Sequence, residues 1–163
     1  MSKKLAISLS ILISTVGLLT AASDFSYFPN GEGITVTGYL GAPTDRFIIP
    51  AMIDGLAVTE IGASVFENTW GFFDTLIEVD IPDSVVRIGE SAFFSCHGIS
   101  QIRLPRNLKE IGYGAFSFTG LTEIIIPQSV TLIERGAFRL PEFGGISGFK
   151  SEPILQQLWR CSI

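Results

Sequence analysis

The sequence is poor in the residues that bind metals or act as nucleophiles. Its 163 residues include one histidine, His97, and two cysteines, Cys96 and Cys161. His97 adjoins Cys96, and neighbouring residues usually point apart, whereas a nucleophile and its base must converge. One histidine and two cysteines without ligand spacing do not make a zinc site, and no Asp-x-Asp-x-Asp-Gly loop is present for calcium. We therefore predict no catalytic residue, no metal site and no cofactor.

Basic side chains are scarce in the first half of the chain. Between Asp24 and Val85, Arg46 is the only base and stands against ten acids, and the formal net charge of the whole chain is -5. Phosphate backbones favour basic surfaces, so we expect no nucleic-acid partner. We interpret the acids as solvated surface carboxylates rather than as a cation-binding patch.

A long apolar run occurs at the N-terminus. Lys3 and Lys4 precede apolar residues 5–19, which are followed by small residues, and this is the layout of a secretory signal peptide. The run is shorter than the roughly 20 residues of a membrane-spanning helix, and no cysteine at its end offers a site for a lipid. We predict a signal peptide over 1–22, cleaved rather than retained. The mature chain would have no membrane span and would be secreted or held at the cell surface.

Internal repetition is abundant. The stretch 81–104 is followed by copies that begin at Leu104-Pro105 and Ile126-Pro127, in steps of 23 and 22 residues. A fixed period in the twenties is typical of a solenoid, whose units bury their apolar faces by stacking. We predict about four repeats over 44–138, of which the first is longer.

Recurring apolar positions predict one shared core. The side chains expected there are Phe66, Phe93, Phe116, Phe138, Ile61, Ile88, Ile111 and Ile133. Cys96 also falls at an inward position, which favours a buried free thiol over a disulfide with Cys161. Gly62, Gly89 and Gly112 share another position and indicate a tight or positive-φ turn. Glu134 replaces this glycine in the last copy, where we expect strain or a different turn.

Alternating residues predict strands. Three segments align position by position, namely 76–81, 99–104 and 121–126. Successive side chains of a strand face opposite sides, so Val79, Ile102 and Ile124 are predicted to point inward, and stacked copies would form a parallel sheet. The residues predicted to share its outward face are Arg46, Ile48, Glu78, Asp80, Gln101, Arg103, Glu123 and Ile125.

Three segments depart from the repeat. Residues 24–43 carry strand-like alternation on both sides of Asn30-Gly31, which predicts a hairpin that caps the N-terminal end. The loop 69–74 carries Trp70, and we interpret it either as a recognition rim or as packing. Residues 139–163 lose the pattern, so they form either an irregular cap or a truncated tail.

The motif Ile-Pro-Asp-Ser-Val-x-x-Ile-Gly-x-x-Ala-Phe-x-x-Cys over 81–96, with its two later copies, resembles the BspA-like, Treponema-type leucine-rich repeat family of bacterial surface proteins. The resemblance implies a right-handed leucine-rich-repeat coil, mainly β with short helical or 3₁₀ turns. It also implies that the sheet side serves adhesion or protein recognition and that the motif carries no catalytic residues. The later copies depart from it by lacking the cysteine.

These observations predict a non-enzymatic, exported module that binds a protein or a glycan through the outward sheet face, with Trp70 at the rim. Two alternatives remain open. A structural spacer of a cell-envelope protein would keep its binding properties after charge reversal at Arg103 and Glu123. A secreted hydrolase using the carboxylates of Glu78 and Asp80 would lose turnover in Glu78→Gln.

Overall fold

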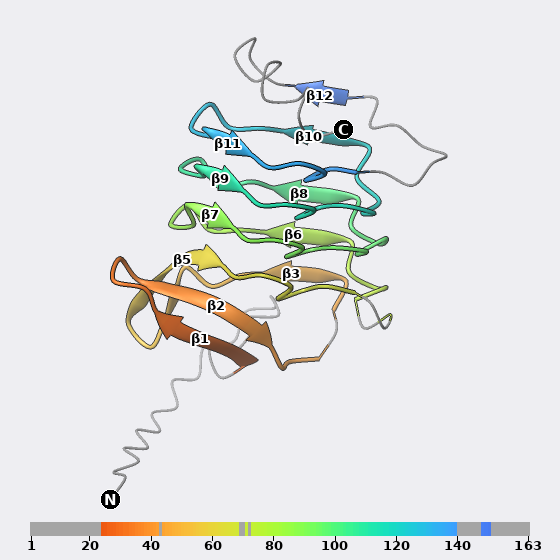
Figure 1. Cartoon of the computed structure of the whole chain (residues 1–163). Helices are drawn as coiled ribbons and strands as arrows, with labels where there is room; N and C mark the ends of the chain where they lie inside the picture. The colour runs from red at the N-terminus through yellow and green to blue at the C-terminus, as the bar shows by residue number, and fades with distance from the viewer. Residues whose placement is uncertain (1–23, 43, 69–70, 72, 140–147, 151–163) are drawn as a thin grey trace, which may run out of the picture.

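The computed structural model describes residues 24–42, 44–68, 71, 73–139 and 148–150. Within them the chain winds into a β-solenoid of four coils stacked along one axis (Figure 1). This confirms the predicted repeat solenoid. The predicted signal peptide, Trp70 and most of the predicted tail lie outside the described residues.

One side of the solenoid is a continuous sheet, which we call the rear sheet. Its order is β1 (Phe25–Pro29), β2 (Ile34–Tyr39), β5 (Leu56–Ile61), β7 (Arg87–Ile88), β9 (Glu110–Ile111) and β11 (Leu132–Ile133), and β4 (Met52–Ile53) pairs with β5. From β2 onward the strands along this order are parallel. The isoleucines of β7, β9 and β11 were predicted to contribute to the core, but these segments were not predicted to form strands.

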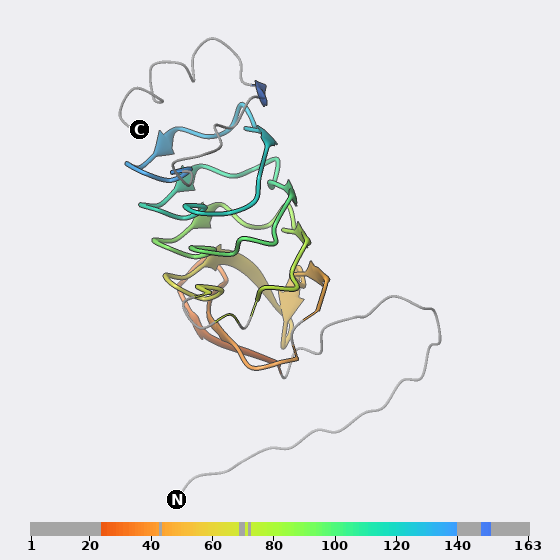
Figure 2. The same cartoon turned by 90° about the vertical axis from the view of Figure 1, so that its right-hand side faces the viewer.

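The opposite side carries a shorter sheet, which we call the front sheet. It consists of β3 (Arg46–Ile48), β6 (Glu78–Asp80) and β8 (Gln101–Arg103), all parallel. The fourth coil contributes β10 (Glu123–Ile125), which pairs with β12 (Gly148–Lys150) instead of joining the ladder of β8. The front sheet is therefore interrupted between the third and fourth coils, although the rear sheet is not (Figures 1 and 2).

The interruption follows a shortened connection. Six positions lead from Phe93 to Ile99, before β8, but only five lead from Phe116 to Leu121, before β10. In the second and third coils, the N–H groups of Ile77 and Ser100 donate to Asp45 and Ile77 carbonyls at 2.7 and 3.0 Å. Among the described residues, Thr122 at the equivalent place has no such backbone hydrogen bond. We attribute the lost ladder to the missing residue, which changes how the chain enters β10.

The N-terminal segment forms an antiparallel hairpin of β1 and β2. Asn30 closes its turn, because its side-chain oxygen accepts the N–H groups of Glu32 and Gly33 at 3.1 and 2.9 Å. β2 runs parallel to β5, so the hairpin extends the rear sheet and covers the first coil. The rings of Tyr39 and Phe47, 4.6 Å apart at their centroids, seal the junction.

A column of phenylalanine rings fills the centre of the coils. Neighbouring rings of Phe66, Phe93, Phe116 and Phe138 lie 5.0, 5.2 and 5.4 Å apart and are parallel within 10°. The eight predicted core residues are all buried. Full burial of one phenylalanine contributes about 1.5–3 kcal/mol, so the column is a principal source of stability.

Hydrogen-bonded turns form the third side of each coil. The N–H groups of Phe66, Phe93 and Phe116 donate to the carbonyls of alanines in the next coil at 2.8, 2.8 and 2.7 Å. No α-helix occurs in the part of the chain that the structure describes, and the strands there are connected by turns. Each coil is thereby bonded to the next through main-chain groups rather than through helix packing.

The repeated glycines were expected to form a tight or a positive-φ turn, and positive φ is not found at Gly62, Gly89 or Gly112. Positive φ occurs two residues later, at Ser64, Ser91, Gly114 and Gly136. Gly89 is required instead by close stacking, because a Cβ there would lie 2.7 Å from the backbone carbon of Gly62. The second coil therefore lies too close to the first for a side chain at this position, whereas the fourth coil carries Glu134 there.

Glu134 takes the place of this glycine in the fourth coil without changing the backbone bonding. Its N–H donates to Ile111 at 2.9 Å, as the N–H of Gly112 does to Ile88 at 2.8 Å. The expected different turn is thus wrong. The Glu134 carboxylate accepts the N–H of Tyr113 at 2.9 Å and so satisfies a main-chain donor of the third coil.

Asn68 holds the two ends of the loop 69–74 together through hydrogen bonds. This buried side chain accepts the N–H of Phe73 at 2.7 Å and donates to the Asp74 carboxylate at 2.7 Å. Phe73 is buried, with its ring centroid 5.7 Å from that of Phe66. Packing therefore accounts for Phe73, whereas the proposed role of Trp70 remains a prediction.

Candidate functional site

The predicted outward residues of the first three coils form two rows across the front sheet. Arg46, Glu78 and Gln101 are register partners in one row. The second row contains Ile48, Asp80 and Arg103. Because the strands are parallel and in register, equivalent side chains stack directly above one another. The structure therefore brings these six residues together on one face.

Charges in these rows pair between neighbouring coils. The guanidinium of Arg46 lies 3.4 Å from the Glu78 carboxylate. Arg103 approaches Asp80 at 2.8 Å and Asp83 at 3.3 Å. All of these side chains are partly exposed, so the pairs contribute little to stability. They do fix the pattern of charge that the face presents.

Asp83 is the anchor of the most connected group. Its carboxylate accepts the N–H of Arg106 at 3.0 Å in addition to the contact with Arg103. The Arg106 N–H, followed by the nearby Arg103 charge, holds the pKa of the Asp83 carboxyl below its ordinary value. The hydrogen bond to Asp80 raises the pKa of Arg103, which therefore stays charged.

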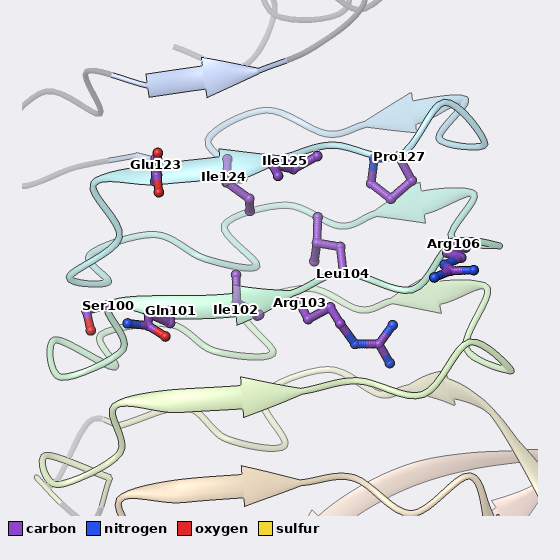
Figure 3. Close-up of a pocket in the computed structure, with 10 residues that line it drawn as sticks. All are labelled: Ser100, Gln101, Ile102, Arg103, Leu104, Arg106, Glu123, Ile124, Ile125 and Pro127. Carbon is purple, nitrogen blue, oxygen red and sulfur yellow. The ribbon is translucent and has the colours of Figure 1, made fainter.

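A pocket of about 650 Å³ opens where the front sheet is interrupted. Five of its lining residues are apolar: Ile102, Leu104, Ile124, Ile125 and Pro127. The other five are polar: Ser100, Gln101, Arg103, Arg106 and Glu123. Figure 3 shows Ser100, Gln101 and Glu123 at one end and Arg106 at the other, with the aliphatic side chains between them, and the guanidinium of Arg103 on the β6 side of β8.

Two isoleucines at the interruption are exposed to different degrees. Ile102 was expected to be buried like Val79 and Ile124, which are 0% and 2% exposed, but it is only partly buried. Ile125 is 68% exposed. The two preceding coils have Asp80 and Arg103 at the position equivalent to Ile125. The fourth coil thus adds the exposed side chain of Ile125 beside the partly exposed side chain of Ile102.

The thiol of Cys96 and the imidazole of His97 are not arranged for catalysis. Cys96 is buried, and its Sγ donates to the Phe66 carbonyl at 3.0 Å, whereas the adjacent His97 is exposed. Burial raises the pKa of the Cys96 thiol to about 12, so the thiolate needed for nucleophilic attack is not formed near neutral pH. No cluster of three or more potential metal ligands is found among the described residues.

Sequence reasoning found the rows but missed the pocket. Glu123 and Ile125 were assigned to the same continuous face, yet they lie across the pocket from β8. Asp83 and Arg106 were not singled out, although both directly follow the proline of their repeats. Comparing the residues after each proline, alongside the strand residues, would have identified these two positions.

The repeated coils, the two stacked sheets and the phenylalanine column define a leucine-rich repeat solenoid. The family model described as BspA type leucine rich repeat region (6 copies) matches residues 59–143, more than half of the chain. The chain belongs to this family, which confirms the resemblance noted in its sequence.

Solved structures of bacterial leucine-rich repeat proteins are similar to this chain. A leucine-rich repeat protein of T. pallidum is 32% identical with a TM-score of 0.58, over 74% of this chain and 66% of that protein. One from Bacteroides capillosus is 28% identical with a TM-score of 0.64, over 82% and 98%. A leucine rich cell surface protein of Faecalibacterium prausnitzii is 25% identical with a TM-score of 0.56, over 81% and 45%.

A search of curated proteins finds no significant match. Within the ranges that the structure describes, no helix has both the length and the apolar character needed to cross a membrane.

Proposed function

We propose that this chain is an exported, non-enzymatic recognition module that binds a partner protein through the outward face of its front sheet. The residues that would make contact are the two rows on β3, β6 and β8, together with Glu123 and Ile125 across the pocket. The affinity would come from shape and charge complementarity over a broad surface.

The observation that carries this proposal is the register of the two rows. Three parallel strands present six side chains as an ordered array of charged, polar and aliphatic groups. A face that only separated other domains would not need this mixture. Ile48 is 36% exposed on it, and Ile125 across the pocket is 68% exposed; exposed apolar side chains among polar ones are common at binding surfaces.

Export is supported by the layout of residues 1–22 and by one relative. The order of basic, apolar and small residues favours a signal peptide. The F. prausnitzii relative is described as a cell surface protein. We therefore place the mature chain outside the cytoplasm, either secreted or attached to the cell surface.

A hydrolytic role is disfavoured by the surroundings of its candidate carboxylates. Glu78 and Asp80 each face an arginine of a neighbouring coil on a partly exposed surface. A general acid needs an apolar or like-charged environment, whereas these two carboxylates lie beside arginines on an open face.

A pair of charge swaps tests the proposal. The double variant Arg46→Glu with Glu78→Arg reverses the charge pattern of the front sheet but keeps an ion pair. The control, Arg87→Glu with Glu110→Arg, swaps an ion pair on the rear sheet that has the same 3.4 Å separation. Both variants and the unmodified chain would be applied to an array of purified secreted and cell-surface proteins.

We expect the front swap to weaken binding to the recognised protein at least tenfold and the rear swap to leave it unchanged. Equal binding by both variants would contradict recognition through the front sheet and would favour the structural spacer. Circular dichroism and thermal melting of the two variants would establish that both keep the solenoid.

A further inference from the structure

We infer that the pocket between β8 and β10 binds an extended peptide segment of the partner, one that carries a large apolar side chain two to four positions away from an aspartate or glutamate. This inference deepens the proposed function, because it assumes that the front side of the solenoid is a recognition surface. It assigns the contact to one place and one ligand chemistry.

The apolar part of the ligand is indicated by the middle of the pocket. Ile102 is only partly buried there, where β10 does not continue the ladder of β8. Ile125 adds an aliphatic wall at an outward position that is charged in the two preceding coils. Covering such a surface is favourable by about 25 cal/mol per Å² of apolar area removed from water, so a large apolar side chain is its complement.

The acidic part of the ligand is indicated by one end of the pocket. Arg106 lies at that end, as Figure 3 shows, and Arg103, which also lines the pocket, extends its guanidinium toward β6. Arg103 is engaged by Asp80 and Asp83. The side chain of Arg106 is exposed and forms no ion pair with any described residue. Its guanidinium therefore remains available to a carboxylate, which it can bind in bidentate geometry.

The opposite end of the pocket fixes the orientation of the ligand. Gln101 and Glu123 line it, so a carboxylate on the ligand is favoured at Arg106 and repelled at Glu123. An extended chain advances about 3.3 Å per residue. Along the pocket, Arg106 lies four residues beyond Ile102 and two beyond Leu104. An extended ligand that runs beside this segment would therefore place its acidic residue two to four positions from its apolar residue.

A peptide fits the pocket better than a glycan does. Its volume of about 650 Å³ lies within the range of about 300–1,000 Å³ that small ligands occupy. None of its lining residues is aromatic, whereas flat aromatic rings are the usual stacking surface for sugars. Aliphatic side chains flanked by charges of both signs match an amphipathic peptide instead.

Selection from a random dodecapeptide library displayed on phage tests the inference with the full chain as bait. We expect enriched sequences to share a large apolar residue separated by two to four positions from Asp or Glu. Synthetic peptides of the enriched sequence should bind at least tenfold more weakly to Ile125→Asp and to Arg106→Glu. Replacing the acid in the peptide by lysine should reduce binding to the unmodified chain by a similar factor.

Matched controls lie in the same coils on the rear side. Leu132→Asp changes an exposed aliphatic side chain of the fourth coil, and Lys109→Glu changes an exposed cation of the third. Both should bind the peptide as the unmodified chain does. Failure to enrich any motif, a basic motif, or equal losses in the pocket and control variants would overturn the inference, as would binding of a glycan array that depends on Ile125 and Arg106.

These failures are distinguishable from failure of the proposed function. If the front charge swap abolishes binding on the protein array while the library yields no apolar and acidic motif, the front sheet is the recognition surface and the pocket is not its peptide site. If the motif is found but neither swap alters binding on the array, the pocket acts without the rows.

Discussion

The rear and front sides of the solenoid respond differently to the same repeat. On the rear side, β5, β7, β9 and β11 form an unbroken ladder, and the phenylalanine column beneath it keeps a spacing of 5.0–5.4 Å through all four coils. On the front side the ladder stops after β8. The core and the rear ladder therefore hold the fourth coil in place, although its front strand, β10, does not pair with β8. The pocket lies between these two strands.

This difference shows how a repeat protein can add a local site without altering its architecture. The inward strand positions stay apolar and the phenylalanine recurs in every copy, since a polar or much smaller side chain there would disturb both neighbouring coils. The outward positions and the connection lengths are free to vary. One residue fewer before β10 and one isoleucine at 125 are sufficient to distinguish the fourth coil from the third.

The largest expected effect comes from breaking the continuous part. Phe93→Ala removes a central ring of the column and should lower the free energy of unfolding by about 3–5 kcal/mol. Phe94→Ala is the matched control, because the next residue is only partly buried and pairs with Phe118 at 5.4 Å. It should cost less than about 2 kcal/mol. Urea unfolding measures the free energy of unfolding of both variants. Similar losses in the two would contradict the conclusion that the phenylalanine column is a principal source of stability.

The next effect concerns the distance between coils. Gly89→Ala places a Cβ 2.7 Å from main-chain atoms of the first coil, and these atoms cannot move aside cheaply. We expect a loss of up to about 3 kcal/mol. Gly136→Ala meets no atom within 4 Å but has a positive φ of 68°, so about 1 kcal/mol is expected. Thermal melting of the two variants compares crowding with backbone strain, and a milder effect at Gly89 would argue against close stacking.

The amount of this fold that the sequence predicts depends on whether a residue faces inward or outward. The periodic Phe and Ile side chains led directly to the core, since an apolar side chain that recurs every 22 or 23 residues has one place to go in a stacked coil. The two-residue rear strands carry no alternation long enough to be recognised as strands. The pocket was missed because the missing residue lies before β10. The apolar pattern of β10 itself is the same as that of β8, so the pattern gives no sign that the two strands do not pair.

The smallest of the stability effects tests the front network through pH. The folded pKa of Asp83 is lowered, so its ionised form stabilises the fold above its unfolded pKa of about 3.9, and this contribution is lost as the pH falls through the folded pKa. The free energy of unfolding of the unmodified chain should therefore be larger than that of Asp83→Asn at pH 6, and the two values should converge by pH 2. Added salt should shrink the difference. A difference independent of pH would show that the charge of Asp83 does not matter.

Amide hydrogen exchange by NMR tests the interruption of the front sheet most directly. Ser100 and Thr122 occupy equivalent positions ahead of β8 and β10, and both have exposed side chains. The Ser100 N–H donates to Ile77 at 3.0 Å and should be strongly protected. The Thr122 N–H should exchange at least a hundredfold faster, while that of Gly112 on the rear side stays protected. Equal protection of Ser100 and Thr122 would mean that the ladder is closed and that the pocket does not exist.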